Sequence, residues 1–383
     1  MVEPFRIAVA HAELDDLHDR LDRTRWPEEV PGGGWDQGVP LAYLRDLCDH
    51  WRHRYDWRAH EARLNALAQF TTRIDGTRVH FIHVRSPEPD AVPLVILHGW
   101  PGSVVELAGL VGPLSDPGAH GAPGASAFHV VAPSLPGYGF SGPTPDRGWG
   151  VSRIAGAMAE LMERLGYASF GAHGGDWGAA IAREIGVLAP DRVRGVHLTM
   201  LSSAVASRRD ADADPQDERE QRSLAATARY RGELSGYAIL QSTRPQTLAY
   251  ALTDSPAGQL AWIVERFKDW TDSRDVPEDA VDRGTLLTTV MAYWLTRTAG
   301  SSARLYWETA HGPGGWGSAP PPSTVPTGMA VFPRDLSVPI RRIAERANRI
   351  VHWTEMERGG HFPALEAPDL LLADIRAFFA ALR

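Results

Sequence analysis

Gly174-Gly175-Asp176-Trp177-Gly178 is the stretch that decides the fold. It follows a short strand pattern at residues 170–173 and opens an amphipathic helix over residues 177–188. A strand that turns sharply into a helix, with glycines on both sides of one reactive side chain, is typical of a nucleophile elbow with aspartate in place of serine. The glycines permit a strained turn and close packing around it. On this segment alone, an ordinary turn with Asp176 as the helix N-cap stays open.

Strand and helix patterns alternate on both sides of this turn. Residues 151–165 have the apolar spacing of an amphipathic helix, and Asp75-Gly76 between two alternating runs predicts a β-hairpin. Strand patterns occupy residues 70–74, 79–84, 92–97, 128–132, 170–173 and 193–198. We therefore expect an α/β-hydrolase fold, in which helices connect the strands of a mostly parallel central sheet.

The alternation breaks after Met200, which predicts an insertion. Residues 201–222 are polar, residues 223–310 look mostly helical, and residues 312–326 form a connector rich in Gly and Pro before strand patterns return at 328–332. We divide the chain into an N-terminal helical extension (1–68), a first part of the core (69–200), a helical cap inserted after the sixth strand (201–327) and a second part of the core (328–383).

Composition narrows the classes of partner. Apolar residues make up 43% of the 383 residues, enough for a sizeable core, and the formal charge of −8 argues against a nucleic-acid partner. Cys48 is the single cysteine, so no intramolecular disulfide is expected. The first residues lack a signal-peptide pattern, and no apolar run approaches the length of about 18 residues that a membrane span needs. We therefore expect a cytoplasmic protein that does not bind a membrane.

Aspartate at the apex of the elbow restricts the chemistry. A serine nucleophile must lose a proton, whereas an aspartate, with an ordinary pKa of about 3.9, is already ionised at neutral pH. A carboxylate that attacks an acyl carbon would form an anhydride, which is a poor intermediate. Attack on an sp³ carbon forms an alkyl ester that water can hydrolyse. Asp176 therefore predicts an alkyl electrophile with a leaving group, either an epoxide or a haloalkane.

A histidine and a second acid can complete the site. Ester hydrolysis needs a general base, and in this fold the order along the chain is nucleophile, acid, histidine. His361 lies in the glycine-flanked loop Gly359-Gly360-His361-Phe362-Pro363, although a surface histidine is the alternative. Asp335 follows a strand pattern and would orient His361 and stabilise its imidazolium. The other usual position for the acid, after Met200, reads Leu201-Ser202-Ser203, so Asp335 is preferred.

Backbone N–H groups must stabilise the negative charge that develops on the Asp176 carbonyl oxygen, each worth roughly 10²–10³ in rate. Trp177, directly after the nucleophile, is expected to supply one of them. The loop His98-Gly99-Trp100-Pro101-Gly102-Ser103 is expected to supply the other, and we choose Trp100. Pro101 has no N–H and restricts the turn behind it.

Together these motifs resemble those of the epoxide hydrolase family, in its microsomal-type branch, which includes insect juvenile-hormone enzymes and soluble bacterial and fungal enzymes. The resemblance covers nearly the whole chain. It rests on Trp35-Asp36-Gln37-Gly38-Val39-Pro40-Leu41, on Tyr55-Asp56-Trp57-Arg58, on HGWPGS at 98–103, on GGDWG at 174–178 and on GGHFPALEAP at 359–368. It implies that no metal or organic cofactor is needed, and the sequence holds no His/Cys cluster with zinc spacing.

The resemblance also implies that two cap tyrosines hold the epoxide oxygen. Gly236-Tyr237-Ala238 and Arg304-Leu305-Tyr306-Trp307 match the family's motifs. Such donors suit the chemistry, because ring opening releases an alkoxide and a phenol with a pKa near about 10 can donate a hydrogen bond at neutral pH. The chain departs from the family's mammalian membrane enzymes, which carry an N-terminal anchor not expected here and use Glu at the position of Asp335.

The reactants expected are a small-molecule epoxide and water. Asp176 would form an alkyl ester, which water activated by His361 would hydrolyse to a vicinal diol. The 13 tryptophans and the aromatic cap favour an apolar, aromatic epoxide. The resemblance implies a role in detoxification or in antibiotic biosynthesis, such as enediyne tailoring, and is compatible with a homodimer. Two alternatives stay open: a haloalkane dehalogenase whose Trp177 binds the halide, and a non-catalytic protein that binds an apolar ligand.

Overall fold

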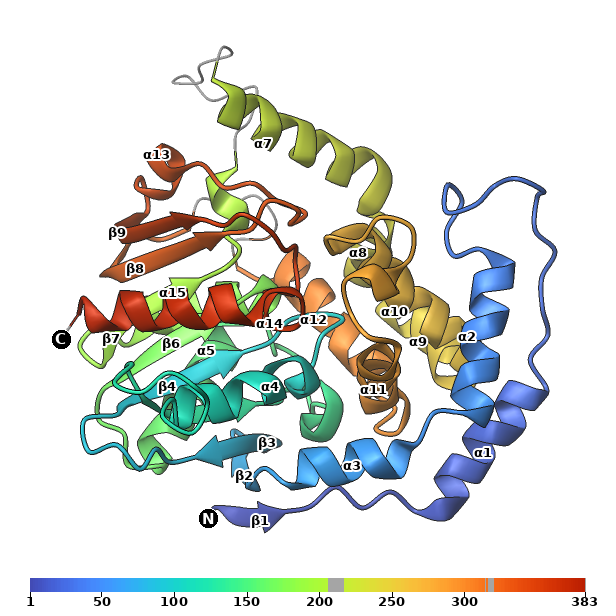
Figure 1. The fold of residues 1–383 in the computed structure, drawn as a ribbon, viewed down its shortest axis with the longest axis horizontal. Coiled ribbons are helices and arrows are strands. Elements are labelled where there is room, and N and C mark those ends of the chain that lie inside the picture. Colours follow the sequence, from blue (N-terminus) through green and yellow to red (C-terminus); the bar gives the residue numbers. More distant parts are fainter. Residues whose placement is uncertain (206–216, 314, 316–319, 383) are drawn as a thin grey trace.

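The computed structural model describes residues 1–205, 217–313, 315 and 320–382. Within these residues a nine-stranded sheet forms the centre of the molecule, in the order β1-β2-β3-β5-β4-β6-β7-β8-β9 (Figure 1). Its strands are β1 (Glu3–Phe5), β2 (Gln69–Ile74), β3 (Thr77–Val84), β4 (Val92–Leu97), β5 (Phe128–Pro133), β6 (Phe170–Gly174), β7 (Val193–Leu198), β8 (Ser323–Val331) and β9 (Asn348–Glu355).

The sheet is mostly parallel, as predicted. Strands β4 to β9 pair in parallel, while β1, β2 and β3 are antiparallel to their neighbours at one edge. The predicted β2–β3 hairpin turns at Asp75 and Gly76, whose φ angles of 47° and 76° suit a two-residue turn. Side chains of β4 alternate between the two faces, so that Leu94 packs in one apolar cluster and Val95 in the other.

Helices cover both faces of the sheet. On one face, α4 (Val104–Ser115) and α15 (Pro368–Ala380) share an apolar cluster with β4 and β5. On the other face, α5 (Val151–Arg164) and α6 (Asp176–Leu188) pack in the larger cluster. Two short helices, α13 (Arg341–Ala344) and α14 (Pro363–Glu366), precede and follow β9. Because parallel strands end at the same edge, the loops after β4, β6 and β8 meet there.

The chain between β7 and β8 forms a helical cap beside this edge (Figure 1). Its helices are α7 (Glu218–Arg229), α8 (Gly236–Thr243), α9 (Pro245–Asp254), α10 (Pro256–Trp270), α11 (Arg283–Trp294) and α12 (Ala299–His311). In the described part of the chain, none of the helices is both long and apolar enough to cross a lipid bilayer.

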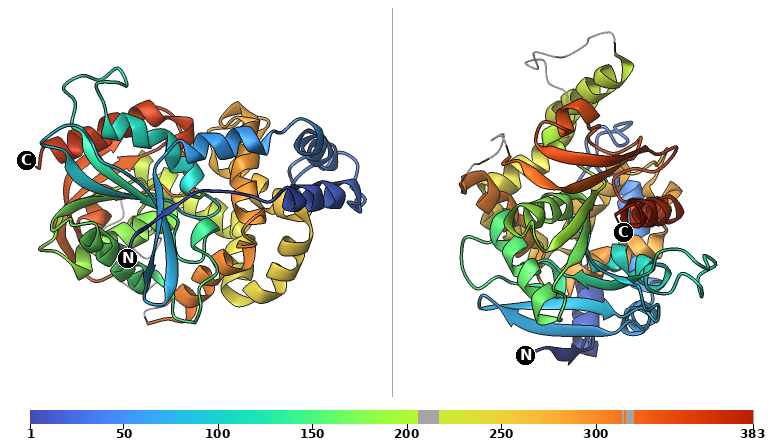
Figure 2. Two further views of the ribbon diagram at one scale, coloured as in Figure 1. Left: turned by 90° about the horizontal axis from the view of Figure 1, so that it is seen from below. Right: turned by 90° about the vertical axis from the view of Figure 1, so that its left-hand side faces the viewer.

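The N-terminal extension runs from the edge of the sheet to the far side of the cap, as Figures 1 and 2 show. It contains α1 (His11–Asp22), α2 (Leu41–His53) and α3 (Trp57–Asn65). Helices α1 and α2 contact α10. Trp51 of α2 is 1% exposed, and its Nε1 donates a hydrogen bond to Sδ of Met291 in α11 at 3.3 Å. The extension therefore connects the sheet to the cap.

Some details differ from the sequence prediction. The extension is not purely helical, because it contains β1, which pairs with β2. This additional strand makes Val193–Leu198, which was predicted as the sixth strand, the seventh in chain order, and the cap follows it as predicted. Strand β1 has only three residues, which are too few to show the alternation of apolar and polar side chains that predicts a strand. β8 begins at Ser323, within the predicted cap, and Pro326, which argues against a strand in sequence, lies where its pairing register shifts. Residues 206–216 of the predicted polar segment, and 314 and 316–319 of the predicted connector, lie outside the described residues.

Candidate active site

Asp176 lies at the apex of a sharp turn between β6 and α6. Its φ of 49° is in the left-handed region, which a residue with a side chain rarely adopts. The flanking glycines provide the space for this turn. A Cβ at Gly174 would lie 2.2 Å from the carbonyl oxygen of Gly178, and a Cβ at Gly178 would lie 2.1 Å from that of Leu97. The turn therefore presents the carboxylate beyond the ends of β4 and β6.

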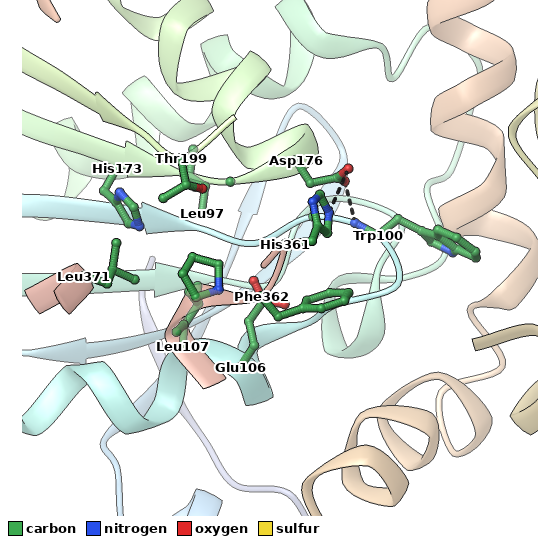
Figure 3. A pocket seen from close by; sticks show the side chains of 14 residues that line it. Leu97, Trp100, Glu106, Leu107, His173, Asp176, Thr199, His361, Phe362 and Leu371 are labelled. Atoms are coloured by element: carbon green, nitrogen blue, oxygen red, sulfur yellow. Dashed lines mark hydrogen bonds and ion pairs between the residues drawn. The ribbon is translucent and has the colours of Figure 1, made fainter. Parts of the chain in front are cut away.

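The loop after β4 supplies a donor to this carboxylate. The N–H of Trp100 donates to Oδ1 of Asp176 at 2.8 Å (Figure 3). Gly99 allows the approach, since a Cβ there would lie 2.2 Å from that oxygen. Trp177 follows Asp176 in the first turn of α6, where backbone N–H groups point out of the helix end. Both residues predicted for an oxyanion hole therefore adjoin the carboxylate.

Two buried side chains hold this loop in place. Nε2 of His98 accepts a hydrogen bond from the N–H of Leu135 at 3.1 Å, and burial lowers the pKa of His98 to about 4, so the ring stays neutral. The hydroxyl of Tyr293, in α11, donates to the carbonyl oxygen of Gly102 at 2.6 Å. The loop is thus tied to both the core and the cap.

His361 lies between two carboxylates. Its Nδ1 is 2.7 Å from Oδ1 of Asp335, and its Nε2 is 3.5 Å from Oδ2 of Asp176. Asp335 comes from the loop after β8, and the ring of His361 lies beside Asp176 in Figure 3. Asp335 and His361 are both buried, and Oδ1 of Asp335 also accepts the N–H of Leu336 at 2.7 Å. The structure thus brings together the three residues predicted as nucleophile, base and acid.

The two carboxylates control the charge of His361. Burial acts to lower the pKa of the imidazole, but the negative charges of Asp335 and Asp176, together with their hydrogen bonds, outweigh burial and raise the pKa to about 10. The ring is therefore an imidazolium at neutral pH in this arrangement.

One partly buried carboxyl group anchors the loop that carries His361. Glu366, in α14, accepts the N–H groups of Gly360 at 2.9 Å and of Phe362 at 2.8 Å. It also accepts the N–H of Asp272, which follows α10 in the cap, at 2.7 Å. A segment of the cap and the loop of His361 are therefore held by the same side chain.

Tyr237 of α8 and Tyr306 of α12 meet in the cap. The centroids of their rings lie 5.8 Å apart, and the two rings meet edge-on. The ring of Tyr237 stacks on Trp100 at 4.9 Å, and that of Tyr306 meets Trp177 edge-on at 4.8 Å. Burial, the neighbouring phenols and the charge of Asp176 raise the pKa of both tyrosines well above the ordinary value. Both therefore keep their protons at neutral pH.

Sequence reasoning missed several residues of this region. Trp270 meets the ring of His361 edge-on at 5.0 Å, and the hydroxyl of Tyr230 lies 3.3 Å from that of Tyr237. Neither belongs to a motif, because their places follow from the packing of the cap. Glu106 lines the same site as Asp176 and His361. A single acid in the apolar run of α4 was a signal that could have identified it.

Within the described residues, no three His, Cys, Asp or Glu side chains are grouped in a way that could hold a metal ion. What the arrangement offers chemically is a carboxylate, an imidazole, two phenols and backbone N–H groups.

Comparison with known proteins assigns this arrangement to a family. The family described as "Epoxide hydrolase N terminus" matches residues 2–107, and the one described as "alpha/beta hydrolase fold" matches residues 92–318. A protein of Stigmatella aurantiaca (strain DW4/3-1) named "Putative epoxide hydrolase" is 46% identical over 383 residues, which cover 100% of this chain and 86% of that protein. The chain belongs to the epoxide hydrolase family of the α/β-hydrolases.

This epoxide hydrolase is also 35% identical to Epoxide hydrolase 1 of Oryctolagus cuniculus, over 98% of this chain and 88% of the relative. The solved structure of Aspergillus niger epoxide hydrolase matches it with a TM-score of 0.88 and 32% identity, covering 100% of this chain and 97% of that one. The predicted resemblance to the microsomal and juvenile-hormone branch is confirmed, as is the α/β-hydrolase fold with an N-terminal extension.

Proposed function

We propose that this epoxide hydrolase converts an apolar, aromatic epoxide to a vicinal diol through a covalent ester at Asp176, which water activated by His361 then hydrolyses. The observation that carries the proposal is that the two oxygens of the Asp176 carboxylate have different partners. Oδ1 accepts the N–H of Trp100 at 2.8 Å, and Oδ2 lies 3.5 Å from Nε2 of His361. One oxygen is thus held as a future carbonyl oxygen, and the other is available to attack.

In the first step, Oδ2 of Asp176 attacks a ring carbon and the C–O bond of the epoxide breaks. The oxygen that leaves carries developing negative charge and needs a proton or strong hydrogen bonds. Tyr237 and Tyr306 suit this task, because both phenols keep their protons and contact Trp100 and Trp177, the residues that flank the carboxylate.

In the second step, water attacks Cγ of the Asp176 ester and gives a proton to Nε2 of His361. Asp335 holds Nδ1 at 2.7 Å and stabilises the imidazolium that forms. The N–H groups of Trp100 and Trp177 stabilise the oxyanion. Collapse of the tetrahedral intermediate breaks the bond from Cγ to the diol oxygen, and this alkoxide oxygen takes the proton back from His361. The second proton of the water leaves the Asp176 carboxyl group as the carboxylate forms again, and it balances the proton that the epoxide oxygen took up in the first step.

The aromatic surroundings support an apolar substrate. Trp100, Tyr237, Trp270 and Tyr306 pack ring against ring, at centroid separations from 4.9 to 6.2 Å. A site built from such faces gains from burying apolar and aromatic surface rather than charged groups.

Single turnover in ¹⁸O-labelled water, with styrene oxide as substrate, tests the covalent route. The first diol formed should carry unlabelled oxygen from Asp176, and repeated turnover should place ¹⁸O in the Asp176 side chain, as peptide mass spectrometry would show. First-turnover diol that carries only solvent oxygen would mean direct attack by water and would exclude Asp176 as the nucleophile.

A second measurement separates the two steps. His361→Gln should still form the ester but should not hydrolyse it, so intact mass spectrometry should show the protein plus one substrate. A chloroalkane serves as the control electrophile. Chloride release without diol formation from styrene oxide would favour the dehalogenase alternative instead.

A further inference from the structure

A small cavity lies beside the Asp176 carboxylate. It leaves about 20 Å³ for the centre of a water molecule, which is room for one water. Asp176, His361 and Glu106 line it together with Gly175, His173 and Thr199. Among the described residues that line it, neither of the cap tyrosines is present. The cavity therefore lies next to His361, and the cap tyrosines do not line it.

Glu106 is the unexplained group in this cavity. It lies in the first turn of α4, and Figure 3 shows its carboxyl group pointing up toward His361. Its Oε2 atom is fully buried and, within the described residues, accepts or donates no hydrogen bond. A buried carboxyl oxygen without a partner is costly, so it is expected to bind water where the space allows.

The charges of the site act on this carboxyl group. Burial raises the pKa of Glu106 to about 8, the positive charge of His361 opposes the increase, and the negative charge of Asp176 adds to it. Glu106 is thus within electrostatic reach of both residues. In either protonation state, a carboxyl group keeps lone pairs that can accept a hydrogen bond from water.

The loop after β4 keeps the Glu106 carboxyl group in this position. A Cβ at Gly102 would lie 1.8 Å from Oε2 of Glu106, so glycine is the residue that leaves room for it. The carbonyl oxygen of Gly102 is itself held by the hydroxyl of Tyr293 at 2.6 Å. The position of the carboxyl group is therefore built into the packing between core and cap.

We propose that Glu106 positions the hydrolytic water, which donates one hydrogen bond to the Glu106 carboxyl group and the other to Nε2 of His361. This inference rests on the covalent route proposed above. A water with both protons engaged directs a lone pair outward, here at Cγ of the Asp176 ester. Its oxygen bonds to Cγ, its proton passes to His361, and the bond from Cγ to the diol oxygen breaks. Glu106 gains and loses no proton in this sequence.

The test compares Glu106→Leu, which removes the acceptor at similar volume, with Glu106→Gln, which keeps a carbonyl acceptor. Stopped-flow tryptophan fluorescence with styrene oxide separates ester formation from ester hydrolysis. Loss of one hydrogen bond to the attacking water should slow hydrolysis in Glu106→Leu by about 10- to 100-fold. Ester formation should change by less than about 3-fold, the ester should accumulate by intact mass, and Glu106→Gln should recover most of the hydrolysis rate.

A second variant moves the Glu106 carboxyl group without changing the residue itself. Gly102→Ala should displace the Glu106 carboxyl group and slow hydrolysis selectively, and it keeps the test available if Glu106→Leu does not fold. Glu163→Gln, an exposed acid on α5, is the control and should match the wild type.

Three results would overturn the inference: an unchanged hydrolysis rate in Glu106→Leu, an equal loss in both steps, or a Glu106→Gln variant as slow as Glu106→Leu. The wild type and His361→Gln are measured in the same series. If neither forms an ester, the covalent route fails and this inference fails with it. If the ester forms but Glu106 does not affect its hydrolysis, only the role of Glu106 is wrong.

Discussion

The imidazole of His361 can change its role during the proposed reaction because one of its two neighbouring carboxylates is consumed. Asp335 and Asp176 together raise its pKa to about 10. An ester at Asp176 carries no charge, so alkylation removes one of these causes and the pKa of His361 must fall. A lower pKa favours the neutral ring, which is the form that acts as a base when water has to be activated. Asp335 remains at Nδ1 and keeps Nε2 directed toward the ester.

Asp335→Asn should therefore impair the second step more than the first. The amide can still hydrogen-bond to the ring, but it no longer stabilises the imidazolium, and it can select the wrong tautomer. We expect ester hydrolysis to slow by about 10²- to 10⁴-fold, with the ester visible by intact mass. Asp369→Asn, an exposed acid paired with Arg358, is the control. Wild-type hydrolysis in Asp335→Asn would show that another residue orients His361.

Changes to the two cap tyrosines should slow the first step, ester formation, more than the second step, ester hydrolysis. Tyr237→Phe and Tyr306→Phe each remove one donor to the epoxide oxygen and leave the ester-hydrolysing groups in place. Each should slow ester formation by about 10- to 100-fold, and the double variant should lose more than either. Tyr250→Phe is a matched control in the same cap, since Tyr250 is 71% exposed. Rapid ester formation in the double variant would exclude both tyrosines as donors.

At the scale of elements, the cap depends on the N-terminal extension. The hydroxyl of Tyr43, in α2, donates to Oε2 of Glu278 at 2.8 Å. Arg283, at the start of α11, pairs with Asp46 of α2 at 2.8 Å. Trp51, also in α2, is fully buried and hydrogen-bonds to Met291 of α11. The extension therefore holds the part of the cap that contains Glu278 and α11.

Trp51→Ala should show how much the extension contributes. Removal of a buried indole should lower the free energy of unfolding by about 3–5 kcal/mol, as urea denaturation would measure. Because α2 contacts α10, whose last residue Trp270 meets His361, KM for the epoxide should also rise. Val30→Ala, at an exposed position of the extension, should change stability by less than about 0.5 kcal/mol. A loss below about 1 kcal/mol in Trp51→Ala would mean that the extension packs loosely on the cap.

Across the whole molecule, the stability changes with pH in opposite directions at two kinds of buried histidine, those with a lowered pKa and His361 with a raised pKa. Burial lowers the pKa of His80 to about 3 and that of His98 to about 4, from an ordinary value of 6.5. These rings stay neutral in the folded protein while the unfolded chain binds protons, so their contribution is present above pH 6.5 and is lost as pH falls. His361 has a raised pKa of about 10, so its contribution is present below pH 6.5 and is lost as pH rises toward 10.

Thermal unfolding from pH 4 to pH 10 should therefore show a maximum of Tm between the two losses, near pH 6.5, where the unfolded histidines titrate. Differential scanning calorimetry would measure it. His361→Gln should make the loss on the alkaline side less steep, because it removes the imidazole with the raised pKa, whereas the buried rings of His80 and His98 remain and still cause the loss on the acid side. A Tm that is constant from pH 7 to pH 10 in the wild type would contradict the raised pKa of His361.

Much of the core could be predicted because its signals are local. Short apolar runs between helical patterns identified β4, β5, β6 and β7, and Asp75-Gly76 identified the hairpin. Motif residues such as Asp176, His361 and Asp335 could be singled out because the chain order of the fold restricts where each can stand. The start of β8 could not be predicted, since Pro326 weakens the strand pattern and pairing with β7 and β9 supplies the missing stability.

The sequence by itself determined that an ionised carboxylate stands in an elbow, which already restricts the chemistry to alkyl electrophiles. Only the tertiary structure decided the distances: Oδ2 of Asp176 at 3.5 Å from His361, Asp335 at 2.7 Å on the other side, and Glu106 in the same cavity. The physical reason is that residue type and spacing fix local turns, whereas burial, charge and hydrogen bonding at a site arise between segments far apart in the chain. The pKa of His361 and the unsatisfied oxygen of Glu106 exist only once those segments have packed together.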